Sequence, residues 1–139
     1  MKVCIVGAGA IGGYIGVQLA GAGIDVSLVA RGAHLAAMRE NGLRLLIDGQ
    51  EILARVRCTD DPSELGRQDF VIIALKAHSI PDAVDSMLPL LGEHTTIVTA
   101  SNGLPYWFFD VAGVPFQGST LASVDAGGRQ REGLGVQRG

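Results

Sequence analysis

The stretch Gly7-Ala8-Gly9-Ala10-Ile11-Gly12 decides how this sequence folds, because its glycines stand at a G-x-G-x-x-G spacing. It follows the β-branched run Lys2–Val6 directly and opens an apolar segment, Ala10–Ala22, with helical spacing. In a strand–turn–helix of this kind, the glycines permit a tight turn, close approach of a phosphate and close helix packing. The N–H groups at the helix start are then free to hold phosphate. We therefore predict that Gly7–Gly12 binds the pyrophosphate of a dinucleotide; the alternative is a purely structural turn.

Outward from this loop, apolar runs alternate with helical patterns. We predict strands at Lys2–Val6, Asp25–Ala30, Phe70–Leu75 and Thr95–Ala100, and helices at Ala10–Ala22, Ala33–Asn41 and from Ser79 to a break at Pro89. The pair Asp48-Gly49 predicts a hairpin between Leu43–Ile47 and Ile52–Arg57. Apolar strands that alternate with helices indicate a parallel sheet covered on both faces. The predicted fold class is therefore α/β, a Rossmann-type doubly wound parallel sheet.

Ligands of such sheets lie beyond the carboxyl ends of the strands, which are Gly7, Arg31, Lys76 and Ser101-Asn102 here. NAD sites usually place an acidic residue at the end of the second strand, where this chain has Ala30 followed by Arg31. This position holds no carboxylate that would repel a 2′-phosphate, and the Arg31 guanidinium can pair with such a phosphate. The sequence therefore favours NADP; the alternative is that Arg31 is a solvated surface residue.

Two further strand-end residues are candidates for the site. Lys76 can meet a phosphate, a ribose or a substrate carboxylate, or it can be a surface lysine. Asn102 can donate and accept hydrogen bonds at once, which suits orienting a carbonyl, but Asn-Gly is also a common turn signal. Residues alone leave both pairs of alternatives open.

Other polar and aromatic residues favour structural roles. Ser79, Asp82 and the neighbouring His78 fit the capped start of a helix better than a nucleophile set. His34 and His94 are expected at the surface. The aromatic run Tyr106–Phe109 packs under a loop or, in the alternative, lines the site or a contact with another domain.

Composition narrows the class of protein. A net charge of -3 argues against nucleic-acid and membrane-surface partners. The uncharged run Val3–Ile24 superficially resembles a signal peptide or membrane span, but seven of its 22 residues are glycine. Cys4 and Cys58 form no C-x-x-C pair and no metal-type cluster with the histidines, so we expect no metal and a reducing, cytoplasmic setting.

The C-terminal end differs in composition from the rest of the chain. Residues 127–139 hold five glycines and three arginines, with only Leu134 and Val136 as aliphatic residues. Such a segment has little apolar surface to bury. We therefore predict a dinucleotide-binding domain over residues 1–128 and a flexible Gly/Arg-rich tail over residues 129–139.

Taken together, the motifs resemble the ketopantoate reductase (2-dehydropantoate 2-reductase, ApbA/PanE) family. The resemblance runs from Met1 to Gly128 and rests on KVCIVGAGAIGGYIG, LVAR, VIIALKAHS, ASNGLPYWFF and LASVDAGG. The glycine loop is shared with many dehydrogenases. The lysine of LKA combined with the asparagine of NG is more specific, and it argues against another hydroxy-acid dehydrogenase.

The resemblance implies NADPH-dependent reduction of 2-dehydropantoate, or a related 2-keto acid, to the hydroxy acid. It implies that Gly7–Gly12 binds pyrophosphate, that Arg31 meets the 2′-phosphate, and that Lys76 and Asn102 are catalytic and cofactor-binding residues, with Asn102 reaching the substrate. It implies a soluble enzyme, and the aromatic run leaves a homodimer open.

Several features depart from the family pattern. Ser79 stands where many members have glutamine, and Ala126 where proline is common. The chain lacks the family's last Rossmann strand and its helical C-terminal domain with a lysine general acid, and we expect the resemblance to end at Gly128. A gene truncation, a frameshift or a cloned fragment would produce this pattern. The alternative function is a nucleotide-binding module, or a truncated remnant, without catalytic activity.

Overall fold

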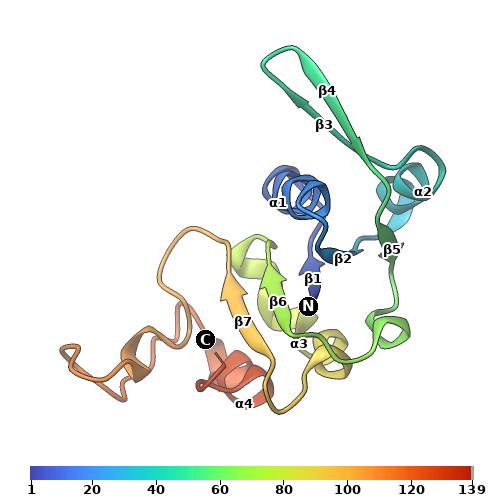
Figure 1. The fold of residues 1–139 in the computed structure, drawn as a ribbon. Coiled ribbons are helices and arrows are strands. Elements are labelled where there is room, and N and C mark those ends of the chain that lie inside the picture. Colours follow the sequence, from blue (N-terminus) through green and yellow to red (C-terminus); the bar gives the residue numbers. More distant parts are fainter. Residues whose placement is uncertain (139) are drawn as a thin grey trace.

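The computed structural model describes residues 1–138 and begins with a βαβ unit. Strand β1 (Lys2–Val6) leads through the glycine loop into helix α1 (Ala10–Gly21), and the chain returns as strand β2 (Asp25–Val29) (Figure 1). Strand β1 is buried from Val3 onward, as expected for the central strand of a sheet covered on both faces.

The remaining helices and strands follow in an order that alternates for most of the chain. They are α2 (Gly32–Asn41), β3 (Leu43–Ile47), β4 (Gln50–Ala54), β5 (Arg57–Thr59), β6 (Phe70–Ile73), α3 (Ile80–Met87), β7 (Thr96–Thr99) and α4 (Arg129–Leu134). Short 3-10 turns cover Pro62–Leu65, Ala77–Ser79, Leu88–Leu90, Phe108–Asp110 and Ala126–Gly128. Helix α3 ends before Pro89, in agreement with the prediction from the sequence.

The main sheet has five strands in the order β5-β2-β1-β6-β7, and all neighbouring pairs are parallel. Numbered along the chain within this sheet, the order is 3-2-1-4-5, which is the order of dinucleotide-binding folds. The prediction of an α/β Rossmann-type parallel sheet is therefore confirmed. The order reverses between β1 and β6, and this reversal marks the ligand edge.

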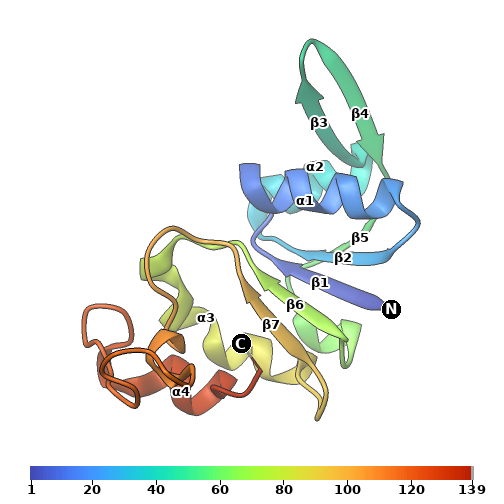
Figure 2. The same ribbon diagram turned by 60° about the vertical axis from the view of Figure 1, so that its left-hand side comes forward.

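Helices cover both faces of the sheet, and each face has its own core. Helices α1 and α2 lie on one side, and α3 and α4 on the other (Figure 2). Alternate residues of β1 divide between the two cores, because side chains of a strand point to opposite faces. Val3 and Ile5 belong to the α1–α2 core, whereas Cys4 and Val6 belong to the α3–α4 core.

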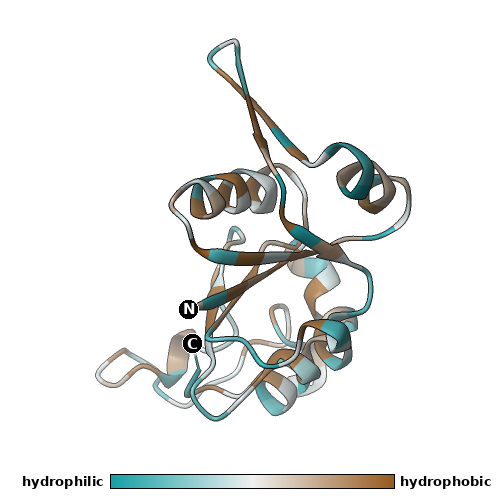
Figure 3. Ribbon diagram, turned by 45° about the vertical axis from the view of Figure 1, so that its right-hand side comes forward, coloured by the Kyte–Doolittle hydropathy of each residue, from teal (hydrophilic) through white to brown (hydrophobic). Residues whose placement is uncertain are grey.

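Strands β3 and β4 form a separate antiparallel hairpin that projects from the α1–α2 side, with hydrophobic strands and a hydrophilic tip (Figure 3). Asp48 and Gly49 both have positive φ at the turn, as a two-residue hairpin loop requires. The prediction that its second strand extends to Arg57 is wrong. The hairpin ends at Ala54, and Arg57–Thr59 joins the main sheet as β5, parallel to β2.

The prediction of a flexible tail is also wrong for residues 129–138, and Gly139 lies outside the described residues. Arg129–Leu134 forms α4, and Leu134 is fully buried in the α3–α4 core. The Asp125 carboxylate accepts hydrogen bonds from the backbone N–H groups of Gln130 (2.8 Å) and Arg131 (2.9 Å), which caps the helix. Whether residues 1–128 form a unit by themselves stays a prediction.

The uncharged run Val3–Ile24 divides into β1, the glycine loop and α1 in the structure. No helix within residues 1–138 has both the length and the apolar character needed to cross a membrane.

Candidate nucleotide-binding site

The carboxyl ends of β1, β2, β6 and β7 meet at one edge of the sheet, and two hollows open there. The first, of about 560 Å³, is lined by Gly7–Gly9, Arg31 and Lys76 among others. The second, of about 640 Å³, is lined by Gly9–Ile11, Lys76 and Asn102 among others. Gly9 and Lys76 line both, so the two hollows form one cleft across the point where the strand order reverses. The structure thus brings the predicted site residues together, except Gly12, which is buried behind the loop.

Each glycine of the loop has a distinct steric role. Gly7 has φ +103°, and a Cβ there would lie 2.9 Å from the carbonyl oxygen of Ala74. A Cβ on Gly12 would lie 1.9 Å from the carbonyl oxygen of Gly7, so only glycine permits this approach of α1 to the loop. A Cβ on Gly9 would meet no atom within 4 Å, so Gly9 faces open space rather than protein. Open space at Gly9 is what a bound phosphate needs.

Helix α1 begins at the cleft with its backbone N–H groups uncovered. Its N-cap residue is Gly9, no side chain caps it, and its first turn contains no acidic residue. The positive end of the helix dipole and the free N–H groups therefore face the cleft, and no carboxylate of the first turn of α1 competes for them.

His34 makes a contact with the glycine loop that was not predicted from the sequence. Its Nε2 lies 2.6 Å from the carbonyl oxygen of Ala8, and because a carbonyl only accepts, Nε2 must carry the proton. The side chain is exposed, as expected, but it also lines the cleft and ties α2 to the glycine loop. The two residues are 26 positions apart, so no local sequence signal could have identified this bond.

Charges in the cleft come from both sides of the reversal point. Arg31, at the N-cap of α2, and Lys76, before the turn Ala77–Ser79, are exposed and line the first hollow. Ala30 is buried and carries no charge, so the end of β2 presents no carboxylate. The first hollow therefore carries two cations and one carboxylate, that of Asp82, and this net positive charge favours a phosphorylated ligand.

Helix α3 adds a polar wall that sequence reasoning missed. Ser79, Asp82 and Ser86 line the first hollow, and their spacing of three and four residues places them on one face of the helix. Ser79 stands at the N-cap of α3, as predicted, but its side chain makes no capping hydrogen bond. The spacing itself was the available signal.

The aromatic run Tyr106–Phe109 contributes to the core more than to the cleft. Tyr106 is buried, its hydroxyl donates to the Gly135 carbonyl oxygen at 2.7 Å, and burial raises its pKa to about 12. Phe108 and Phe109 meet edge to face, with ring centroids 5.2 Å apart. These contacts favour the interpretation that the run packs under a loop, and a homodimer through it stays a prediction.

Comparisons with known proteins agree with this arrangement. The family model for ketopantoate reductase PanE/ApbA matches residues 3–105. A 2-dehydropantoate 2-reductase of Mesorhizobium japonicum is 53% identical over 139 residues, which is 99% of this chain and 43% of that protein. The expectation that the resemblance ends at Gly128 is therefore wrong.

Solved structures show the same fold. A crystal structure assigned as a ketopantoate reductase from Ralstonia solanacearum has a TM-score of 0.92 at 46% identity and covers 98% of this chain and 42% of that one. D-mandelate dehydrogenase, solved with NADH and anilino(oxo)acetate, has a TM-score of 0.70 at 27% identity and covers 76% of this chain and 35% of that one. The chain thus spans about two fifths of the length of the proteins from Mesorhizobium japonicum and Ralstonia solanacearum. With its glycine loop, its strand order and the match over residues 3–105, the chain belongs to the ketopantoate reductase PanE/ApbA family.

Proposed function

We propose that this chain binds NADPH and forms the cofactor-binding part of a reductase that converts 2-dehydropantoate, or a related 2-oxo acid, to the hydroxy acid. The observation that carries the proposal is the convergence of the glycine loop, Arg31 and Lys76 on one cleft at the reversal point of the sheet. Buried free thiols at Cys4 and Cys58 suit a reducing cytoplasm, which is part of the proposal.

The residues of the cleft fit a dinucleotide. The open space at Gly9 and the uncovered N–H groups of α1 suit a pyrophosphate. The hydrogen bond from His34 occupies the Ala8 carbonyl oxygen, which reduces the repulsion that this oxygen would exert on a nearby phosphate. The polar face of α3, with Ser79 and Asp82, suits the hydroxyl and amino groups of an adenosine.

Preference for a 2′-phosphate rests on Arg31. A guanidinium at the end of β2 can pair with a phosphate by two parallel hydrogen bonds, and Ala30 offers no carboxylate to bind a ribose hydroxyl. D-mandelate dehydrogenase has a structure with NADH, so the choice between the two cofactors is a property to test in each member.

The proposed reaction uses the far end of the cleft. When bound, the nicotinamide supplies a hydride to the ketone carbon of the substrate. The Lys76 ammonium lies where it can attract an anionic group of the substrate or cofactor, and the Asn102 amide can donate a hydrogen bond to the ketone oxygen. Relatives named for 2-dehydropantoate and for D-mandelate both act on 2-hydroxy or 2-oxo acids, which supports this substrate class.

The test is a calorimetric titration of the 139-residue chain with NADPH and with NADH. Loss of a charge-assisted hydrogen bond costs about 1.5–3 kcal/mol, so Arg31→Ala should weaken NADPH binding by roughly 10- to 100-fold and leave NADH binding unchanged. The control is Arg55→Ala, which removes an exposed arginine outside the cleft. An unchanged ratio of the NADPH and NADH affinities in Arg31→Ala contradicts the NADP assignment. If the unsubstituted chain binds neither cofactor, the proposed function is contradicted.

A nucleotide-binding module without chemistry is the second candidate. Reduction of a ketone needs a proton donor as well as a hydride, and the chain offers few lysines for that role. The chain contains only Lys2 and Lys76. Lys2 begins β1, at the end of the strand away from the cleft, so Lys76 is the one lysine positioned at the site. Turnover of 2-dehydropantoate by the chain alone separates the two candidates.

A further inference from the structure

A third hollow lies beyond Asn102, and the proposed function does not use it. It has a volume of about 420 Å³ and lies between the start of α3, the loop that follows β7 and the segment 122–130. We call it the tail pocket. It shares Ala77, Ser101 and Asn102 with the second hollow of the cleft, so the two spaces meet at the proposed position of the substrate ketone.

Over residues 1–138, the walls of the tail pocket hold no carboxylate, ammonium or guanidinium group. Within the described residues, its lining contains no aspartate, glutamate, lysine or arginine, and His78 is its one basic side chain. Apolar side chains such as Ile80, Leu104 and Val124 alternate with neutral polar ones such as Ser123 and Gln130. Lys76 lines both hollows of the cleft and not the tail pocket. Anionic groups are therefore favoured on the Lys76 side, and an uncharged group with at most neutral hydroxyls fits the tail pocket.

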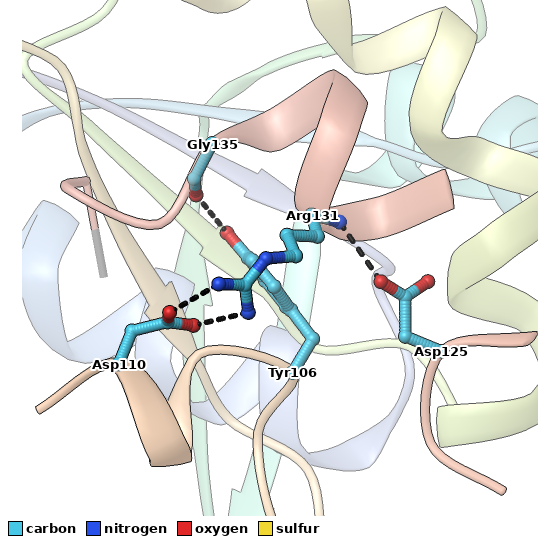
Figure 4. A network of polar contacts seen from close by, with 5 residues as sticks. All are labelled: Tyr106, Asp110, Asp125, Arg131 and Gly135. Carbon is cyan, nitrogen blue, oxygen red and sulfur yellow. Dashed lines mark hydrogen bonds and ion pairs between the residues drawn. The ribbon is translucent and has the colours of Figure 1, made fainter. Parts of the chain in front are cut away.

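A network of polar contacts holds the wall of the tail pocket in place (Figure 4). Arg131 forms a fork of two hydrogen bonds to the Asp110 carboxylate, and its backbone N–H donates to Asp125. Gln130 donates from its side chain to the Val124 carbonyl oxygen at 2.8 Å. Together with the bond from Tyr106 to Gly135, these contacts tie the loop after β7, the segment 122–126 and α4 to one another. A wall fixed in this way selects ligands by shape, because little ordering is needed on binding.

We propose that the tail pocket receives the uncharged tail of a 2-oxo acid whose carboxylate lies toward Lys76, and that it determines substrate choice. This inference rests on the proposed function. Because an apolar cavity of about 150 Å³ is enough to hold benzene, the tail pocket has room for a branched or aryl tail. A tail that ends in a second carboxylate would meet no ammonium or guanidinium group there and only the His78 imidazole, so dicarboxylic 2-oxo acids are disfavoured.

The experiment compares two 2-oxo acids of nearly equal size on the NADP⁺-saturated, ¹⁵N-labelled 139-residue chain. Benzoylformate has an uncharged aryl tail, and 2-oxoglutarate has a second carboxylate. NMR titration should show benzoylformate binding at least tenfold more tightly, with shifts of the Gln130 side-chain amide, which lies in the pocket wall. Equal affinities, or no binding of either acid to the cofactor-saturated chain, overturn the inference.

Ser123→Arg adds a cation to an exposed position of the pocket wall and should reverse the preference, weakening benzoylformate and strengthening 2-oxoglutarate. Ser119→Arg is the matched control, because Ser119 is exposed and lies outside the pocket lining. Circular dichroism and the Kd for NADPH show whether each variant is folded. A folded Ser123→Arg chain with an unchanged ratio of affinities overturns the tail pocket and leaves the proposed function standing. Failure of the wild-type chain to bind NADPH removes both.

Discussion

Truncation of Leu134 tests whether residues 129–138 belong to the folded domain. Leu134 is fully buried in the α3–α4 core, which also contains Val84 and Met87. Leu134→Ala removes three buried carbon groups, each worth about 0.8 kcal/mol of transfer free energy, so the loss is about 2.4 kcal/mol before any cavity is counted. The cavity term brings the expected loss in the free energy of unfolding to about 3–4 kcal/mol. This is a large part of the roughly 7–20 kcal/mol expected for a domain of this size.

The assay is equilibrium unfolding in urea, followed by circular dichroism. Leu46→Ala is the matched control, because Leu46 is 71% exposed on the hairpin and its truncation should change the free energy by less than about 0.5 kcal/mol. A change in Leu134→Ala as small as that of the control would mean that the segment is not packed, and it would restore the flexible tail predicted from composition. An unchanged m-value is needed for the comparison to hold.

Four further outcomes are expected. Gly9→Val should fold with an unchanged circular dichroism spectrum yet not bind NADPH, because the new side chain fills open space that the pyrophosphate needs; binding by the folded variant would mean that the loop is only a turn. His34→Ala should weaken NADPH binding several-fold and His34→Gln should restore part of it by donating to the Ala8 carbonyl, whereas equal affinities in all three chains would exclude a positioning role. The chain with saturating NADPH and 2-dehydropantoate should show almost no loss of absorbance at 340 nm, and turnover in the ordinary range of about 1–10³ per second that disappears in Lys76→Ala would identify Lys76 as the acid. Burial raises the pKa of the Cys4 thiol from 9.0 to about 12, so the native thiol should resist alkylation at pH 8. The contribution of this thiol to stability should be lost as the pH rises from 9 to 12, because only the unfolded chain releases the proton in that range. Rapid alkylation of the folded chain, resolved by mass spectrometry, would contradict this burial.

The sheet could be predicted because its signals are local. The glycine loop, the apolar runs of β1, β2, β6 and β7 and the Asp48-Gly49 turn each carry their own pattern of residues. Strand β5 has only three residues and follows the hairpin directly, so alternation alone could not show where one ends and the other begins. Its place beside β2 is determined by pairing of Leu28 with Cys58, which is a tertiary contact.

Helix α4 was not predicted because the glycines in and around it outweighed its helix-forming arginine, glutamine, glutamate and leucine residues in the composition of the segment. Gly133 lies inside it, and a Cβ there would lie 2.3 Å from Val84, so the glycine is needed for packing rather than for helix formation. Its stability comes from Asp110 and Asp125, both outside the helix, and from burial of Leu134. Composition therefore indicated disorder where tertiary contacts impose order.

The candidate site also combines residues with local signals and residues placed by tertiary contacts. Strand ends could be located from the sequence, and with them Arg31, Lys76 and Asn102. His34 and the polar face of α3 could not be assigned to the cleft, because their positions depend on how α2 and α3 pack against the sheet. The roles of all these residues stay predictions until the titrations are made.

The contacts around Arg131 also determine how this region opens. A six-residue helix is too short to persist without its partners, so breaking the fork to Asp110 or the cap at Asp125 releases α4 and the wall of the tail pocket together. We therefore expect the segment from Tyr106 to Gly135 to exchange its amide hydrogens through one shared opening rather than residue by residue. Any molecule that binds against this wall slows that exchange throughout α4, including at amides that it never touches.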